Sequence, residues 1–475
     1  MLKELRTVRC LRPVQIVNRF TRRLPPFPRF PKPALRARAG YWVEPVVYEP
    51  APLTVPSRLR DYTVHYHPRP QVEPVELWIR ENPAGRGAGW EPYPLSRRIV
   101  NWIKWMMGGG LATSGVSESL AAQADYLSRT VEYHLLANHL FANAKAVAFA
   151  GCFFDRERWL GEGLRLLERA IPEQILADGG HFERSPMYHS LIFEDMLDLV
   201  NLGRAYPGLL PDWSGVAARM SGWLKQMLHP DGQVAFFNDS AFGVAAEPRL
   251  LFDYAARLGI DPVTVLPAES GYIRLESAAT VVLFDAGPLG PDYQPGHAHC
   301  DTLSFEMSHL GRRVLVNSGI STYEDNADRH AQRGTAAHNT IRLDGQDQSE
   351  VWAAFRVARR ARPFNITTDH RTFAEASHDG YTRLKDPVIH TRRLDLSESE
   401  LRISDTLQAA HQHRAEMYFH LHPQSEGSIQ LDSKLTRAEE PTLWHPEFDR
   451  SEPNRTVVGR WTGQCPVQFT TRVSF

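Results

Sequence analysis

The stretch VEYHLLANHLFANAKAVAFAGCFF, residues 131–154, decides the fold of the first half of the chain. It places Leu135, His139, Ala142 and Ala146 at intervals of three or four residues, the spacing of one helix face. RWLGEGLRLLERAIPEQI (158–175) repeats this spacing, and SLIFEDMLDLVNLGRAYPG (190–208) and VAARMSGWLKQMLHPDG (216–232) follow after short loops. The pattern predicts a helical bundle or an (α/α) toroid.

Past Gly271 the pattern changes to short strands separated by turn residues. Examples are GYIRLES (271–277), ATVVLFDAG (279–287), TLSFEMSHLG (302–311) and RRVLVNSG (312–319). Such a run predicts antiparallel sheets, most simply a β-sandwich. The expected fold class is therefore α+β and multidomain. We expect an N-terminal basic, proline-rich arm and extension over 1–90, the toroid over 91–262 and the sandwich over 263–475.

Composition excludes several function classes. Lys+Arg is 54 against 55 for Asp+Glu, so the chain has no general attraction to nucleic acid, and an anionic partner needs a local patch. Cys10, Cys152, Cys300 and Cys465 show no CxxC spacing and are expected to be free thiols. The sequence contains no apolar run of about 18 residues, so it predicts no transmembrane helix. No apolar segment follows the basic N-terminus, so we expect a cytoplasmic or inner-membrane-peripheral protein, with the periplasm left open.

Residues 1–40 form a basic segment with 11 Lys or Arg and one acid, Glu4. Prolines make regular helix impossible in its second half. These are Pro25, Pro26, Pro28, Pro31 and Pro33. The segment is expected to be an extended arm. The arm either contacts a polyanion or the lipids of a membrane surface, as in a peripheral membrane protein, or is a solvated arm that lies on the body of the protein.

Polar clusters interrupt the apolar pattern of the helical half. Asn138, His139 and Asn143 lie within one helix, where asparagine has poor propensity. In ADGGHFERSPMYHS (177–190), Ser185-Pro186 predicts a helix start. That start places Tyr188 in the first turn, where the helix end and the neighbouring Arg184 are expected to lower its pKa. Polar residues flank it: His181, Glu183, Arg184 and His189.

Further clusters lie at strand ends in the second half. In GHAHCDTLSFEM (296–307), His297 and His299 point to opposite faces or, with a bend, toward one site. A His-x-His pair is common in metal sites but also occurs without a metal. VLVNSGISTYEDN (314–326) ends a strand at Asn317, and RGTAAHNTIRLDGQDQ (333–348) opens one at His338.

Five of these segments in order resemble the heparinase II/III superfamily of polysaccharide lyases, over about residues 95–360. They are ANHLFANAKA, DGGHFERSPMYH, GHAHCDTLSFEM, VLVNSGISTY and AHNTIRLDGQ. The resemblance implies a toroid followed by a β-sandwich, with the active site in the cleft between them. It implies Tyr188 and His297 as catalytic residues, and Asn138 with His139 as partners of a uronate carboxylate. Related enzymes act on heparan sulfate, heparin, alginate and other uronates.

The same resemblance places His299, residue 317 and His338 where the family often holds a structural divalent metal, Zn or Ca. The family usually has Asp there, and this chain has Asn317. Losing an anionic ligand weakens such a site, so we expect weak metal binding or none, and no cofactor required for catalysis.

The expected chemistry is β-elimination of an anionic polysaccharide. A base removes the weakly acidic C5 proton, the C4 glycosidic oxygen leaves, and the uronate carboxylate must be neutralised meanwhile. Tyr188 and His297 are the acid and base in an order left open, and Asn138 and His139 are the neutralisers. The expected substrate-binding residues are His181, Glu183, Arg184, His189 and Asn143.

Two alternatives remain open. A glycoside hydrolase needs two carboxylates roughly 5–9 Å apart, for which Glu183 with Asp239 or Asp301 are the candidates. A non-catalytic glycan-binding or exopolysaccharide-assembly protein could use the same fold, and the basic arm suits such a role. The oligomeric state stays open.

Overall fold

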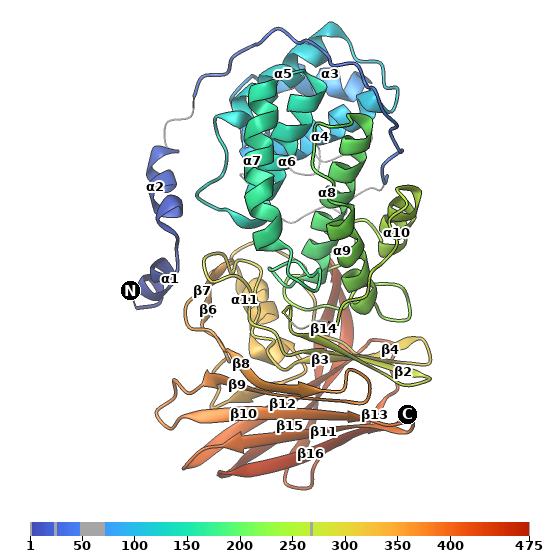
Figure 1. Ribbon diagram of the computed structural model, residues 1–475. Coiled ribbons are helices and arrows are strands. Elements are labelled where there is room, and N and C mark those ends of the chain that lie inside the picture. Colours follow the sequence, from blue (N-terminus) through green and yellow to red (C-terminus); the bar gives the residue numbers. More distant parts are fainter. Residues whose placement is uncertain (1, 23–25, 48–71, 267–268, 475) are drawn as a thin grey trace.

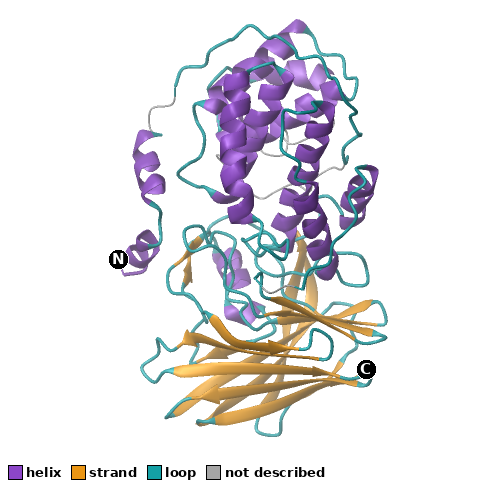
Figure 2. Ribbon diagram, viewed as in Figure 1, coloured by secondary structure: helices purple, strands orange, loops and turns teal. Residues whose placement is uncertain are grey.

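The computed structural model describes residues 2–22, 26–47, 72–266 and 269–474, so the expectations for Arg23 and Pro25 fall outside the described residues. Most of the helices gather in one half of the molecule and the sheets in the other, with α11 lying among the elements of the sheet half (Figures 1 and 2). The helices are α1 Leu2–Arg9, α2 Pro13–Thr21, α3 Val72–Glu81, α4 Pro92–Met107, α5 Ser114–Ser128, α6 Ala137–Phe153, α7 Glu157–Gln174, α8 Pro186–Ala205, α9 Ser214–Gln226, α10 Pro248–Arg257 and α11 Ala327–Arg333, with short 3₁₀ turns at Ala88–Trp90 and Thr335–Ala337.

Helix α6 is the centre of the helical half, and α4, α5, α7 and α8 pack around it. Its contact with α7 depends on two glycines. A Cβ on Gly151 would lie 2.3 Å from the backbone nitrogen of Leu160, and one on Gly163 would lie 2.5 Å from that of Ala148. Any larger side chain at either position would force the two helices apart.

The second half is a β-sandwich of antiparallel strands. The strands are β1 Tyr272–Glu276, β2 Thr280–Asp285, β3 Phe305–His309, β4 Arg312–Leu315, β5 Ile341–Leu343, β6 Val351–Trp352, β7 Arg356–Val357, β8 Pro363–Thr368, β9 Phe373–Tyr381, β10 Val388–Leu396, β11 Glu400–Gln408, β12 Gln412–Leu421, β13 Ser428–Gln430, β14 Thr436–Glu447, β15 Arg450–Gln464 and β16 Val467–Ser474. One sheet runs β1-β2-β3-β4-β12-β15-β14 with β5 beside β12, the other runs β13-β16-β11-β10-β9-β8, and β6 pairs with β7.

The sandwich core follows from alternation along its strands. In β10 every second residue is buried, including Leu394 and Leu396, while the residues between them are more accessible. These side chains meet Phe305, Met307 and Phe419 of the opposite sheet in one apolar cluster. The toroid and sandwich expected from the sequence are thus both present, with α10 ending at Arg257 and β1 beginning at Tyr272.

The N-terminal region differs from the expected extended arm. Residues 26–39 have no helix or strand, but α1 and α2 make most of the first 21 residues helical. Helix α3 belongs to the helical half, because Trp78 packs edge-on against Trp102 of α4 with ring centroids 5.7 Å apart. None of the described helices is both long and apolar enough to cross a bilayer.

Candidate active site

The start of α8 positions Tyr188 as the sequence predicts. The Ser185 hydroxyl caps the helix by accepting a hydrogen bond from the Tyr188 backbone nitrogen at 3.1 Å, and Pro186 occupies the first turn. The turn before it needs a glycine. Gly179 has φ +91°, and a Cβ there would lie 2.3 Å from the carbonyl oxygen of Arg219. Tyr188 is consequently held, half-buried, at the end of the helix that faces the sandwich.

His297 and His299 converge on one carboxylate, so the bend that the sequence left open is present. Asp239, in the loop between α9 and α10, lies 2.9 Å from His297 Nδ1 and 2.8 Å from His299 Nε2. Arg329 of α11 donates to both oxygens of the same carboxylate. Asp239 and Arg329 are fully buried. Burial alone would raise the pKa of Asp239, but Arg329 and the two histidines hold it well below its ordinary value.

This arrangement fixes the tautomer of His297. An ionised carboxylate can only accept hydrogen bonds, so Nδ1 carries the proton. The lone pair is then on Nε2, which lies 3.3 Å from the Asn138 side-chain nitrogen on α6. Side chains from both halves of the molecule therefore meet at His297, whose Nε2 is poised as a proton acceptor.

Asn138 is oriented by Glu183. Its amide nitrogen donates to Glu183 Oε2 at 2.9 Å, which leaves a second N–H directed toward His297. Burial raises the pKa of Glu183, and its other oxygen has no hydrogen-bond partner within the described residues. His181 Nδ1 is 4.0 Å from Glu183 on the buried side. Glu183 thus acts on Asn138, and His181 lies behind Glu183.

Tyr188 lies against His297 and a second tyrosine. Its ring stacks on that of His297 with centroids 3.7 Å apart, and its hydroxyl is 3.0 Å from the Tyr323 hydroxyl. Burial raises the pKa of Tyr188 well above its ordinary value, and the hydroxyl of Tyr323 and the carboxylate of Asp239 raise it further. The expected lowering by Arg184 is wrong, because that guanidinium donates to backbone carbonyls of Phe182, Glu269 and Ser270 instead.

The remaining predicted residues are placed outside this cluster. His139 Nδ1 lies 3.2 Å from Glu132 Oε2, and its ring packs against Tyr93. Asn143 is fully buried and donates to the Ser96 hydroxyl at 2.9 Å. His189 is also buried, with its nitrogens directed to the His181 backbone nitrogen and the Met220 carbonyl oxygen. The geometry therefore brings together Asn138, Glu183, Tyr188 and His297, and gives the others partners inside the protein.

Two family models match the two halves that contribute to this site. The heparinase II/III N-terminus matches residues 115–252, and the heparinase II/III-like C-terminal domain matches residues 265–466. The chain belongs to the heparinase II/III family. The solved structure of heparinase III has a TM-score of 0.68 at 18% identity and covers 84% of this chain and 72% of that chain. The likeness supports the (α/α) toroid and β-sandwich as the family fold.

Curated relatives of this heparinase II/III protein carry two kinds of name. A heparin-sulfate lyase of Pedobacter heparinus is 27% identical over 318 residues, or 57% of this chain and 47% of that protein. FtsZ-localized protein C of Caulobacter vibrioides is 26% identical over 399 residues, or 76% of this chain and 66% of that protein. The chain spans about half the length of the curated lyases that it matches.

The residues expected to hold a metal lie near one another in the buried region behind Asp239. The rings of His299 and His338 have centroids 5.3 Å apart, and His299 Nδ1 and both His338 nitrogens lack a hydrogen-bond partner within the described residues. These neutral nitrogens fit a metal ligand set. The third member, Asn317, is uncharged and its oxygen accepts from the Asn339 backbone at 3.2 Å. Across the described residues, no three His, Cys, Asp or Glu side chains form a metal group.

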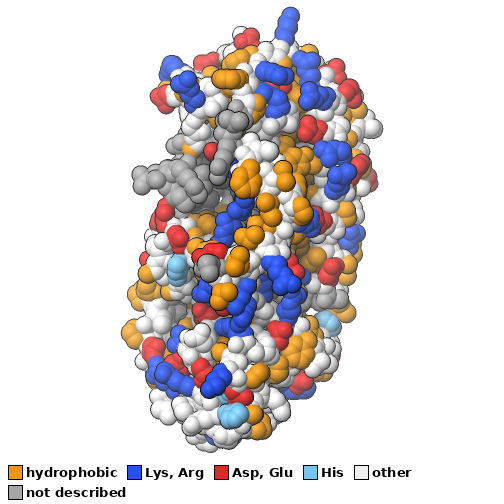
Figure 3. Space-filling model, turned by 90° about the vertical axis from the view of Figure 1, so that its left-hand side faces the viewer, with side chains coloured by type: hydrophobic (Ala, Val, Ile, Leu, Met, Phe, Trp, Pro, Cys, Tyr) orange, Lys and Arg blue, Asp and Glu red, His pale blue; other side chains and the backbone are white. Residues whose placement is uncertain are grey.

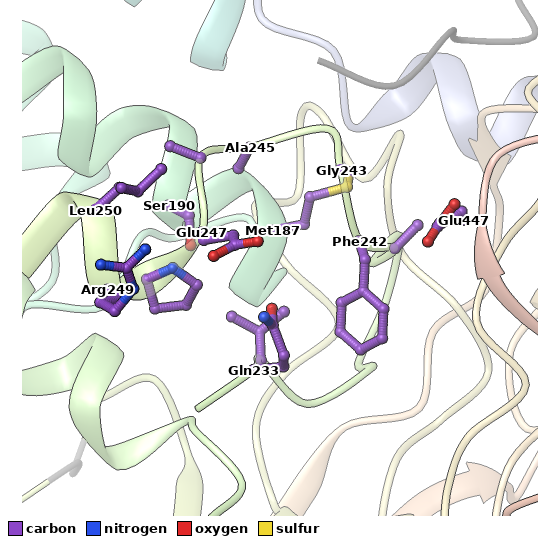
Figure 4. Close-up of a pocket in the computed structure, with 14 residues that line it drawn as sticks. Met187, Ser190, Gln233, Phe242, Gly243, Ala245, Glu247, Arg249, Leu250 and Glu447 are labelled. Atoms are coloured by element: carbon purple, nitrogen blue, oxygen red, sulfur yellow. The ribbon is translucent and has the colours of Figure 1, made fainter. Parts of the chain in front are cut away.

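A pocket of about 550 Å³ lies beside the cluster, between α8, the loop 233–247 and the end of β14 (Figure 4). It is lined by Met187, the residue before Tyr188, but not by Tyr188, His297 or Asn138. Its charged residues are Glu247, Arg249 and Glu447, so acids outnumber bases. Because that balance disfavours a polyanion, the pocket is a poor candidate for the uronate site.

Three residues at the site, Tyr323, Asp239 and Arg329, have no role in the lyase interpretation of the sequence. Tyr323 belongs to the quoted segment VLVNSGISTY, yet nothing in its spacing relates it to Tyr188. The sequence suggests Asp239 only as a carboxylate of the hydrolase alternative, and it suggests no role for Arg329. These residues are far apart in the sequence. Asp239 is 58 residues from His297 and 90 residues from Arg329. A buried Asp-Arg pair leaves no periodic signal in a sequence.

Proposed function

We propose that this protein cleaves a uronate-containing glycan by β-elimination. The observation that carries the proposal is the meeting of Asn138, Tyr188 and His297 around one point, with His297 oriented by Asp239. A carboxylate partner, a neutral phenol and a histidine whose unprotonated Nε2 faces the site are the groups that this reaction needs.

His297 is the proposed base that takes the C5 proton. Asp239 holds its Nδ1 proton, so Nε2 is the atom that accepts. The imidazolium formed by this step would be stabilised by the same carboxylate. Arg329 keeps Asp239 ionised throughout, since the pair is buried and doubly hydrogen-bonded.

Tyr188 is the proposed acid that protonates the departing C4 oxygen. Its raised pKa keeps the phenol neutral near pH 7, which suits a proton donor and opposes a resting tyrosinate. The hydroxyl lies beside the Tyr323 hydroxyl, which can accept a hydrogen bond and orient the phenolic proton. Stacking on His297 keeps acid and base on the same side of a bound sugar ring, as a syn elimination requires.

Asn138 is the proposed carboxylate partner. One of its amide hydrogens is held by Glu183, and the other points toward the reacting side chains. A uronate carboxylate placed there would accept this hydrogen bond more strongly as charge moves onto it in the transition state. Burial raises the pKa of Glu183, so its carboxyl group is more easily protonated than one in water, which would reduce its repulsion of a uronate carboxylate.

The hydrolase alternative has little geometric support. Asp239 is committed to two histidines and Arg329, and Asp301 accepts a hydrogen bond from the Asn238 backbone nitrogen at 2.8 Å. Glu183 is buried against Asn138. The non-catalytic alternative keeps one specific point in its favour, the sequence similarity to FtsZ-localized protein C, which covers 76% of this chain against 57% for the heparin-sulfate lyase of Pedobacter heparinus.

The test is an ultraviolet assay against heparan sulfate, alginate, polyglucuronate and bacterial exopolysaccharides. A lyase produces a 4,5-unsaturated uronate that absorbs in the ultraviolet, whereas a hydrolase yields only a new reducing end. His297→Ala serves as the inactive control. Saturable binding without any product on the whole panel would favour the glycan-binding alternative and overturn the lyase proposal.

A further inference from the structure

Helices α1 and α2 lie on the outside of the molecule and contact it through polar side chains. The Thr7 hydroxyl accepts a hydrogen bond from the Trp352 indole at 3.1 Å. Gln15 is fully buried, and its amide nitrogen lies 3.3 Å from the backbone oxygens of both Leu135 and Tyr293. The inward face of this helix pair is therefore the polar one.

Ion pairs also join this helix pair to the rest of the protein. Three acids of the body accept from three arginines, in the pairs Arg6–Glu350, Arg12–Glu173 and Arg22–Glu91. Arg12 also lies over the Tyr293 ring, 3.8 Å from its centroid. These contacts attach α1 to the sandwich half and α2 to the helical half and the loop that carries Tyr293.

The outward face is apolar, which reverses the usual arrangement of a surface helix. Leu2, Leu5 and Val17 are 65%, 62% and 58% exposed. In the segment that continues from the helices, Phe27 and Phe30 are 91% and 68% exposed. We call α1, α2 and residues 26–32 the N-terminal strap. Such a concentration of exposed apolar side chains on one face is unusual for a protein surrounded only by water.

Basic side chains lie between the apolar ones. Five of them are exposed and form no ion pair with a carboxylate anywhere in the described part of the chain: Lys3, Arg9, Arg19, Arg29 and Lys32. Figure 3 views the side of the molecule that carries α1 and α2, and shows a band of hydrophobic side chains with Lys and Arg beside it. The net charge of the whole protein is only −1, so this positive surface is local.

We propose that the N-terminal strap binds the surface of an anionic phospholipid bilayer. Its apolar side chains would enter the boundary between headgroups and acyl chains while the basic ones meet the phosphates. A second copy of this chain fits the surface less well, because pairing two straps would bring like charges together. Since the strap contacts both halves of the protein, binding would hold both halves at the bilayer.

The experiment is co-sedimentation of the full-length protein with vesicles of phosphatidylglycerol and phosphatidylethanolamine, and with vesicles of phosphatidylcholine alone. The apolar variant carries Leu2→Ser, Leu5→Ser and Val17→Ser. The basic variant carries Lys3→Gln, Arg9→Gln and Arg19→Gln. The matched control carries Leu111→Ser, Leu310→Ser and Leu443→Ser, which replace three exposed leucines elsewhere.

We expect the wild type and the control to bind the anionic vesicles and to bind phosphatidylcholine weakly. The basic variant should bind roughly a hundredfold more weakly, from about fivefold for each basic residue near an anionic surface, and the apolar variant more than tenfold more weakly. Raising the salt concentration should release the wild type. All replaced residues are exposed, so melting temperatures should be unchanged.

Three results would overturn the proposal. The first is wild-type protein that stays in solution with anionic vesicles, and the second is an apolar variant that binds as well as the control. The third is a dimer in solution that only the apolar variant dissociates, since the strap would then be an interface between copies. Lyase activity on soluble glycans does not enter this test, so its outcome is separate from that of the proposed function.

Discussion

Replacing Tyr188 with Phe separates the chemical role of its hydroxyl from its packing. The ring and its stacking on His297 remain, and only the hydrogen bond to Tyr323 at 3.0 Å is lost. One such bond contributes about 0.5–1.5 kcal/mol to folding, so the free energy of unfolding should fall by about 1 kcal/mol. Tyr323→Phe removes the same bond from its other side. The two variants should therefore show similar, small decreases in melting temperature.

Their activities should differ. If Tyr188 donates the proton to the leaving oxygen, Tyr188→Phe should lower kcat by about 10²–10⁴-fold, the usual contribution of general acid–base catalysis. Tyr323→Phe removes only the group that orients this proton, and we expect a loss of about tenfold or less. The assay is initial-rate ultraviolet absorbance on the best substrate of the panel. A Tyr188→Phe enzyme with more than about a tenth of wild-type kcat would refute the assignment, as would a Tyr323→Phe enzyme that is the less active of the two.

Three other outcomes are expected. Asn138→Ala should lower kcat much more than it raises KM, because the amide binds most strongly in the transition state; an effect on KM alone would make it a positioning residue. Chelator dialysis should leave the melting temperature of the wild type nearly unchanged, whereas Asn317→Asp should make melting metal-dependent; a tightly held stoichiometric Zn²⁺ in the wild type would contradict this. Burial lowers the pKa of His189 to about 3 and that of His420 to about 4 in the folded protein, whereas a histidine in the unfolded chain has a pKa of about 6.5. Below about pH 6.5 the unfolded chain therefore binds more protons at these two residues than the folded protein does. The free energy of unfolding should therefore be unaffected by these histidines above about pH 6.5 and should fall toward pH 4, by on the order of 3 kcal/mol for each histidine. A melting temperature that stays constant between about pH 6.5 and about pH 4 would contradict this prediction.

Local sequence chemistry explains why the start of α8 could be predicted. A serine cap, a proline in the first turn and a preceding Asp-Gly-Gly turn specify the helix start within a few residues, and Tyr188 follows from it. The pKa of Tyr188 could not be predicted in the same way. It depends first on burial and then on Tyr323 and Asp239, which come from distant segments, while the guanidinium of the nearby Arg184 is directed to backbone carbonyls.

The N-terminal arm shows a second limit of reasoning from sequence. Its prolines correctly predict that residues 26–39 form no helix. The helices α1 and α2 precede this segment, and α2 begins at Pro13, which occupies its first turn. Even a correct helix prediction would have placed the apolar face of α1 and α2 inward, as periodicity ordinarily implies. The orientation is set by Gln15, Arg6 and Arg12, whose partners come from elsewhere in the chain.

Asp239 shows why the site needs both halves of the protein. It lies in the loop between α9 and α10, while His297, His299 and Arg329 come from the second half. Removing its charge would leave the buried Arg329 without the carboxylate that balances its charge, which typically costs about 3–5 kcal/mol, so this carboxylate is a structural contact as well as an orienting group. The same contact sets the His297 tautomer. The proposed base is therefore correctly protonated only when the two halves are packed together, which couples catalysis to the folded arrangement of both.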